Sequence, residues 1–92
     1  MTPGLKLLNE AGIRFNEYCD PKHRLPLPLG GSSPLAGQGS PLDSLALTNF
    51  IMEVELLIEE QGLKVNLTDG QALAHLDCAG SLARYLEERW LV

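Results

Sequence analysis

GSPLDSLALTNFIMEVELLIEEQ, residues 39–61, is the most informative stretch of this chain. Its first three residues include a glycine and a proline, and the rest contains no glycine, no proline and no basic residue. Asp43 and Ser44 stand at this boundary, and both residue types are favoured at the N-cap of a helix. The pattern predicts a helix over residues 44–61, which Gly62 ends in a left-handed conformation.

The apolar residues of this helix lie on two sides. At about 100° per residue, one side carries a core stripe that we expect to be buried. The core stripe consists of Leu47, Phe50, Ile51, Val54, Leu57 and Ile58. A second line, here called the outer stripe, lies roughly opposite and consists of Leu45, Met52 and Leu56. Its polar and acidic neighbours are Thr48, Asn49, Glu53, Glu55, Glu59 and Glu60. Either the long loop covers the outer stripe or a partner binds it, and the acidic rim favours a partner.

A first helix is predicted over residues 3–18. Thr2 supplies an N-cap hydroxyl, and proline follows at the first helical position. Gly12 weakens this helix by about 1 kcal/mol relative to alanine, so tertiary packing must stabilise it. The apolar residues that share one face are Leu8, Ala11, Phe15 and Tyr18.

Residues 19–43 are predicted to form a long loop. Prolines and glycines recur every few residues through this segment, which excludes regular helix or strand. Loops of this length are usually functional or disordered. Several leucines argue against full disorder, and we expect some of them to dock on the helices. They are Leu25, Leu27, Leu29, Leu35 and Leu42.

Two more helices are predicted after the main one. Thr68 and Gln71 have the spacing of a capping box, which predicts a short helix over residues 69–75. Asp77 can cap a last helix over residues 78–90. The residues that share a face of that helix are Ala79, Leu82, Leu86 and Trp90. The expected fold is all-α: one domain, residues 1–92, forming a four-helix bundle with three longer helices, a short third helix and a long first loop.

Composition restricts the classes of function. The chain is 45% hydrophobic and 21% charged, which is typical of a soluble globular domain. Its few aromatic residues favour helices over sheets. The formal net charge of −5 argues against nucleic acid as a partner, because phosphates require a basic surface.

No apolar run in the sequence exceeds three residues, so we expect neither a membrane-spanning helix nor a secretory signal. Cys19 and Cys78 are too few for a disulfide scaffold, and we interpret them as free thiols in the reducing cytoplasm. His75 precedes Cys78 by three residues, but two ligands do not make a metal site, so no metal is expected.

Three interpretations of Ser44 compete. It is a helix cap, a catalytic nucleophile or a site of covalent modification. A nucleophile needs a base, but His23 and His75 have no matching carboxylate in the sequence, and the G-x-S-x-G elbow is absent. A phosphate ester at a helix N-terminus is favoured by free backbone N–H groups and by the helix dipole. Modification is therefore preferred to catalysis, and the protein is not expected to be an enzyme.

With these features the chain resembles the acyl carrier proteins, which are small four-helix bundles with a 4′-phosphopantetheine arm on a serine. The motif is Leu-Asp-Ser-Leu over residues 42–45, followed by a helix that ends in a glutamate-rich turn. Downstream, "LTDGQAL" and "GSLARYL" resemble the third and fourth helices of the family. The resemblance covers residues 34–90.

The resemblance implies that Ser44 carries the arm, which a phosphopantetheinyl transferase takes from coenzyme A. It also implies that Asp43 assists this transferase and its magnesium ion. The partner-binding surface falls on the outer stripe and its neighbours, which geometry had singled out independently. The expected partner-binding residues are Leu45, Thr48, Asn49, Met52, Glu53 and Leu56.

The chain also departs from the family pattern. Carriers of central fatty acid synthesis usually have Val-Glu-Leu where this chain has Thr48-Asn49-Phe50. We therefore expect a monomeric, specialised carrier in a lipid or secondary-metabolite pathway. Its partners would be an acyl- or aminoacyl-loading ligase and downstream acyl-transfer enzymes. The alternatives are an aminoacyl or peptidyl carrier, or an unmodified helical adaptor.

Overall fold

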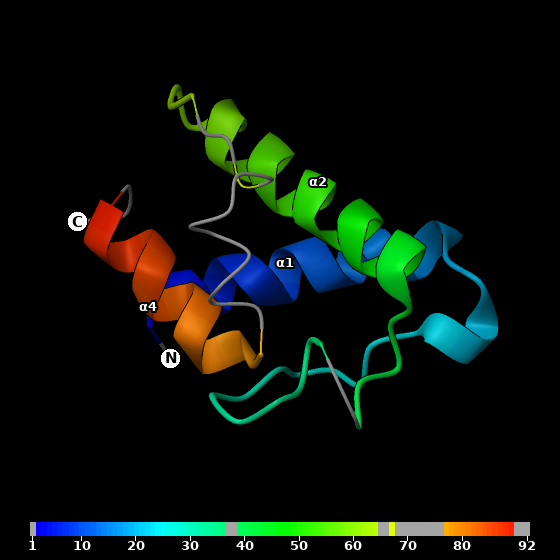
Figure 1. Ribbon diagram of the computed structural model, residues 1–92. Helices are drawn as coiled ribbons and strands as arrows, with labels where there is room; N and C mark the ends of the chain where they lie inside the picture. The colour runs from blue at the N-terminus through cyan, green and yellow to red at the C-terminus, as the bar shows by residue number, and fades with distance from the viewer. Residues whose placement is uncertain (1, 37–38, 65–66, 68–76, 90–92) are drawn as a thin grey trace.

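The computed structural model describes residues 2–36, 39–64, 67 and 77–89. These residues form three α-helices and one 3-10 helix: α1 (Pro3–Tyr18), η1 (Pro21–His23), α2 (Ser44–Glu60) and α4 (Ala79–Arg89). Within the described ranges the only β-type pairing is an isolated bridge between Pro34 and Cys78, so this part of the protein is all-α. Both α2 and α4 pack against α1 (Figure 1). The helix predicted over residues 69–75 lies outside the described residues.

Helix α1 has the predicted bounds, and a local signal determines its start. The Thr2 hydroxyl accepts a hydrogen bond from the Leu5 N–H (3.3 Å), as expected of an N-cap. On the predicted face, Leu8, Ala11 and Phe15 are buried. The fourth residue of that face, Tyr18, is 55% exposed.

Tyr18 is exposed because it ends the helix and its phenol has a polar hydroxyl. The ring edge packs on Phe15, with the two ring centroids 5.8 Å apart. The hydroxyl points away from the core and donates to the backbone carbonyl of Asn49 at 3.5 Å. A tyrosine in this position joins the C-terminal turn of α1 to α2 without entering the core.

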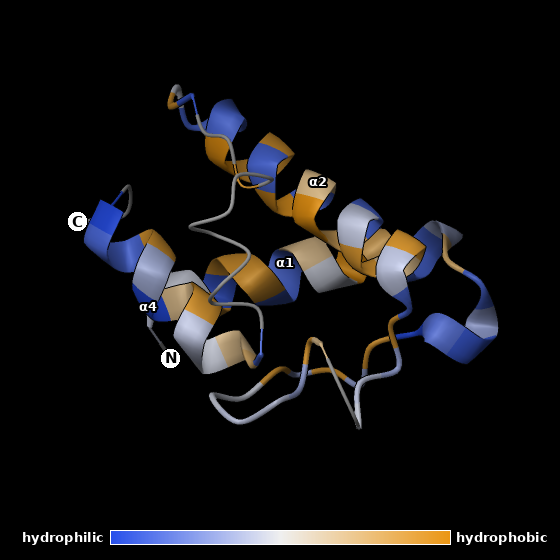
Figure 2. Cartoon of the chain, viewed as in Figure 1, coloured by the Kyte–Doolittle hydropathy of each residue, from blue (hydrophilic) through white to orange (hydrophobic). Residues whose placement is uncertain are grey.

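Helix α2 buries its core stripe as predicted. Five of the six residues are buried, and Leu47 is partly buried against the same core. The helix ends at Glu60, one residue before the predicted end. Gly62 then adopts a positive φ of 90°, and its N–H bonds to the Glu59 carbonyl at 2.9 Å. In Figure 2, apolar positions run along α2 and hydrophilic positions gather near its C-terminal end.

Helix α4 begins at Ala79, one residue later than predicted, and the loop supplies partners for its first N–H groups. Ala79 N–H donates to the Ser33 carbonyl (2.8 Å), and Gly80 N–H donates to the Gly31 carbonyl (2.9 Å). Asp77 lies before the N-cap position, and its backbone carbonyl accepts from the Leu35 N–H (3.2 Å). The loop therefore contributes to the start of α4. Leu82 and Leu86 are buried as predicted, whereas Trp90 lies outside the described residues.

The long first loop is docked on α1. Three of its leucines, Leu25, Leu29 and Leu35, are buried, whereas Leu27 is more than one-third exposed. Gly12 permits close packing here, because a Cβ atom at this position would lie 2.9 Å from Leu27 Cδ2. This contact gives the tertiary support that the glycine in α1 requires. The expectation that some loop leucines dock on the helices is confirmed.

Candidate functional site at the start of α2

Ser44 is the first residue of α2, and Asp43 is the N-cap. Asp43 Oδ1 accepts a hydrogen bond from the Ala46 N–H at 2.7 Å, and the Asp43 carbonyl accepts from the Leu47 N–H at 2.8 Å. The Ser44 side chain is exposed, and its hydroxyl has no hydrogen-bond partner among the residues that the structure describes. Because Asp43 performs the capping, the Ser44 hydroxyl is available for other chemistry.

His23 lies against the segment that precedes Ser44. Its Nδ1 is 2.8 Å from the Pro41 carbonyl, and its Nε2 is 3.4 Å from Asp43 Oδ2. The sequence interpretation that neither histidine has a matching carboxylate is therefore wrong for His23. The contact joins residues twenty positions apart across an irregular loop, so no sequence periodicity could have indicated it. The sequence has one local signal for the short turn that carries His23, and that signal is Asp20. Its carboxylate accepts a hydrogen bond from the Lys22 N–H (3.1 Å) and so caps the 3-10 helix.

Serine, histidine and aspartate are neighbours here, but their arrangement differs from that of a hydrolase. In a Ser-His-Asp triad, one ring nitrogen bonds to the nucleophile and the other to the carboxylate. In this protein, the two ring nitrogens of His23 face Pro41 and Asp43. No contact with the Ser44 hydroxyl is found within the described part of the chain. In this arrangement His23 is engaged by the Pro41 backbone and by Asp43, and not by the Ser44 hydroxyl.

A pocket of about 310 Å³ lies between the end of α1, η1 and the start of α2. Phe15 and Ala46 give it apolar surface, and Ser44 does not line it. Its remaining lining residues are Tyr18, Cys19, Asp20, Lys22, His23, Asp43, Leu45 and Asn49. Burial and the negative charge of Glu53 raise the pKa of Tyr18. Through Leu45 and Asn49, this pocket adjoins the outer stripe.

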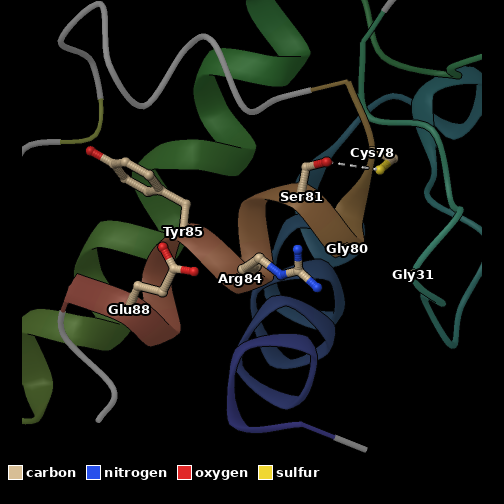
Figure 3. Close-up of a pocket in the computed structure, with 7 residues that line it drawn as sticks. All are labelled: Gly31, Cys78, Gly80, Ser81, Arg84, Tyr85 and Glu88. Atoms are coloured by element: carbon tan, nitrogen blue, oxygen red, sulfur yellow. Dashed lines mark hydrogen bonds between the residues drawn. The ribbon is translucent and has the colours of Figure 1, made fainter.

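A second pocket, of about 510 Å³, lies between α4 and the loop at Gly31. Figure 3 shows Arg84 and Glu88 on α4, and the side chains of Cys78 and Ser81 face each other near its start. Cys78 Sγ and Ser81 Oγ are 3.3 Å apart. The loop carbonyls already satisfy the first N–H groups of α4, so this helix start does not offer them to an anion.

The outer stripe is open to solvent. Leu45 is 71% exposed, Met52 51% and Leu56 49%, so the alternative that the long loop covers these residues is wrong. Thr48 is also exposed, and its hydroxyl donates to the Ser44 carbonyl at 2.9 Å. Asn49 and Glu53, the remaining expected partner-binding residues, are partly buried.

Two carboxylates of the predicted acidic rim form bonds within the chain. Glu55 Oε2 accepts from the Leu67 N–H at 2.9 Å. Glu60 forms a two-bond ion pair with Arg14, at 2.7 and 3.1 Å. Hydrogen bonding to Arg14 lowers the pKa of Glu60 and correspondingly raises that of Arg14. Glu53 and Glu59 therefore carry the rim charge that can act on a partner.

Both cysteines are free thiols. Across the described ranges, no three His, Cys, Asp or Glu side chains come together in a way that could hold a metal ion. His75, considered with Cys78 in the sequence, lies outside those ranges. None of the described helices is long and apolar enough to cross a membrane.

Comparisons of the chain with protein-family models, with curated proteins and with solved structures give no match. The family resemblance therefore rests on the sequence motifs alone. What it implies for Ser44 is a proposal, to be weighed against the geometry described above.

Proposed function

We propose that this protein is an acyl carrier, with a bundle of the acyl-carrier type, and that Ser44 receives a 4′-phosphopantetheine arm. The observation that carries the proposal is the state of Ser44. Its hydroxyl is exposed at the first residue of α2, immediately after a loop, while the neighbouring Asp43 performs the capping. A serine needed only for the start of the helix would occupy the N-cap itself.

The surroundings of Ser44 fit a phosphodiester. The Ala46 N–H is bonded to Asp43, and the positive end of the helix dipole favours a further negative group at this position. Asp43 is turned toward the Ala46 N–H and His23, so its carboxylate is held by neighbours within the chain. The reacting hydroxyl is accessible to a modifying enzyme, because Ser44 and its neighbour Leu45 are both exposed.

The modification is a phosphoryl transfer from coenzyme A. A bond forms between Ser44 Oγ and the phosphorus that bears the pantetheine, and the P–O bond of the pyrophosphate linkage breaks. Adenosine 3′,5′-bisphosphate leaves with the electron pair, and the serine proton passes to a base on the transferase. Once attached, the arm supplies a terminal thiol that holds an acyl or aminoacyl group as a thioester.

The outer stripe supports recognition by partner enzymes. It offers a small apolar contact beside Ser44, and the charges of Glu53 and Glu59 attract basic surfaces over a longer range. A carrier must release each partner, and a short apolar line with steering charges suits a transient complex. We therefore place the transferase, the loading ligase and the acyl-transfer enzymes on this face.

The test is the intact mass of the apo protein after incubation with coenzyme A, magnesium and a promiscuous phosphopantetheinyl transferase. The expected result is the gain of one phosphopantetheinyl group by the unaltered chain and by Ser32→Ala, which removes an exposed loop hydroxyl. Ser44→Ala should gain nothing. If the unaltered chain gains no mass while a known carrier is converted in parallel, the carrier function is wrong and the unmodified adaptor is favoured.

A further inference from the structure

One side chain bridges η1 to the segment that leads into Ser44. The His23 ring, which is partly buried, lies 2.8 Å from the Pro41 carbonyl and 3.4 Å from the Asp43 carboxylate. A carbonyl oxygen can only accept a hydrogen bond, so the hydrogen in the Pro41 contact is on Nδ1. The ring therefore contacts the backbone three residues before Ser44 and the side chain one residue before it.

The element that carries His23 is itself fixed to α1. The Asp20 carboxylate caps η1, and two residues after His23 the backbone of Leu25 is hydrogen-bonded at both polar groups by Asn16. Leu25 is also buried in the core. His23 thus extends from a part of the loop that is fixed to α1. Its hydrogen bond to Pro41 links the segment before Ser44 to this fixed part.

The segment before Ser44 is otherwise held mainly by contacts within the loop. The Ser40 hydroxyl donates to the Leu35 carbonyl (2.9 Å) and accepts from the Leu42 N–H (3.1 Å). Asp43 is bonded to the first turn of α2, and Leu42 packs partly on the core. Among the described residues, the hydrogen bond and the ion pair that join residues 41–43 to an element other than α2 come from His23. Removing the imidazole would leave the Pro41 carbonyl without this donor and Asp43 with its capping bond alone.

We propose that His23 is a positioning residue for the modification of Ser44. Its Nδ1–H holds the Pro41 backbone, and in the doubly protonated ring Nε2–H also pairs with the Asp43 carboxylate, so that the serine hydroxyl and the acid beside it meet the transferase in one arrangement. This inference rests on the proposed carrier function. His23 does not contact the reacting hydroxyl, and it acts through Pro41 and Asp43. The partner-binding stripe on α2 is formed independently of it.

The test measures steady-state transfer of phosphopantetheine from coenzyme A to folded apo protein, with carrier concentration varied. For His23→Ala we expect kcat to fall about 3- to 10-fold, the effect of losing one or two modest hydrogen bonds at a reacting centre. The KM for the carrier should stay nearly unchanged, because the outer stripe is intact. Met52→Ala should show the opposite pattern, a higher KM with kcat retained.

Two conservative variants separate the contacts of His23. In His23→Asn the amide nitrogen replaces Nδ1 and can still donate to Pro41, whereas in His23→Gln it replaces Nε2 and faces Asp43. We expect His23→Asn to recover more of kcat, because it retains the shorter contact. Arg24→Ala, which changes an exposed side chain on the same segment, is the control and should behave as the unaltered chain.

The possible outcomes distinguish this inference from the carrier function. If the unaltered chain is not modified at all, the carrier function fails and the inference fails with it. If the unaltered chain is modified and the three His23 variants retain its kcat, only the inference is wrong. Thermal unfolding of each variant is recorded alongside. A lower melting temperature with unchanged kcat would give His23 a structural role and also overturn the inference.

Discussion

Asn16 binds the backbone of Leu25 through both of its side-chain polar atoms. Its amide nitrogen donates to the Leu25 carbonyl (3.0 Å), and its oxygen accepts from the Leu25 N–H (2.9 Å). Seven residues earlier on α1, Asn9 makes the same pair of bonds with Leu29, at 3.3 and 2.6 Å. Two asparagines, two helical turns apart, thus provide hydrogen-bond partners for the backbone N–H and C=O groups of the loop where it enters the core.

Asn16→Ala should destabilise the protein. The substitution leaves two partly buried backbone groups of Leu25 unpaired, at a cost of about 1–3 kcal/mol. Asn16→Asp keeps the acceptor but puts a second acceptor oxygen against the Leu25 carbonyl, so it should also destabilise the protein. Urea unfolding followed by circular dichroism measures both, with Glu17→Ala as the exposed control from the same helix. An Asn16→Ala protein as stable as the control would show that these bonds do not hold the loop.

The sequence predicts the helices of this fold better than it predicts the loop. The ends of α1 and α2 come from local chemistry: the Thr2 cap, the Asp43 cap and Gly62 after the last turn. The two asparagines carry no such signal, since an asparagine within a helix is usually solvent-exposed. Their role becomes visible only when the buried leucines of the loop lie beside α1.

The same distinction applies to the candidate site. Helical geometry puts Ser44 at the start of the helix and the outer stripe opposite the core, so the sequence predicts both positions. That the loop leaves the stripe open is known only from the structure. The contact of His23 with Pro41 and Asp43 depends on the path of an irregular segment, and sequence spacing does not encode that path. The sequence thus indicates the hydroxyl that we propose is modified, and the structure adds the contacts of His23 with the residues that precede it.

Leu56 and Leu57 are adjacent on α2 but should respond very differently to truncation. Leu57 is 5% exposed and Leu56 is 49% exposed. Leu57→Ala should destabilise the fold by about 2–5 kcal/mol, as expected of a buried leucine. Leu56→Ala should change stability by less than about 0.5 kcal/mol. Urea unfolding tests both, and equal losses would mean that the outer stripe is covered in solution.

The chain comes too close at Gly80 to accept a side chain. A Cβ atom there would lie 2.5 Å from the Gly31 carbonyl oxygen, which is itself bonded to the Gly80 N–H. Gly80→Ala should therefore push the loop away from α4 and destabilise the protein by about 1–3 kcal/mol. Gly30→Ala is the matched control, because a Cβ atom there meets nothing within 4 Å. If thermal melts show equal stability for the two variants, the close approach is absent in solution.

The ion pair between Arg14 and Glu60 should make a small, pH-dependent contribution to stability. Because hydrogen bonding to Arg14 lowers the folded-state pKa of Glu60, the stabilisation is present above the ordinary pKa of a glutamate. It is lost as pH falls through the lowered folded-state pKa. The side chains of Arg14 and Glu60 are 42% and 55% exposed, so solvent screening keeps the effect small.

Arg14→Gln tests this pair. In an NMR titration of the side-chain carboxyl, the pKa of Glu60 should rise toward the ordinary glutamate value. The stability difference between this variant and the unaltered chain should be largest near neutral pH, shrink in acid and diminish with added salt. Glu59→Gln, which alters the exposed neighbouring carboxylate, should not abolish the lowered pKa of Glu60. A Glu60 pKa that is unchanged by Arg14→Gln would mean that the two side chains do not pair in solution.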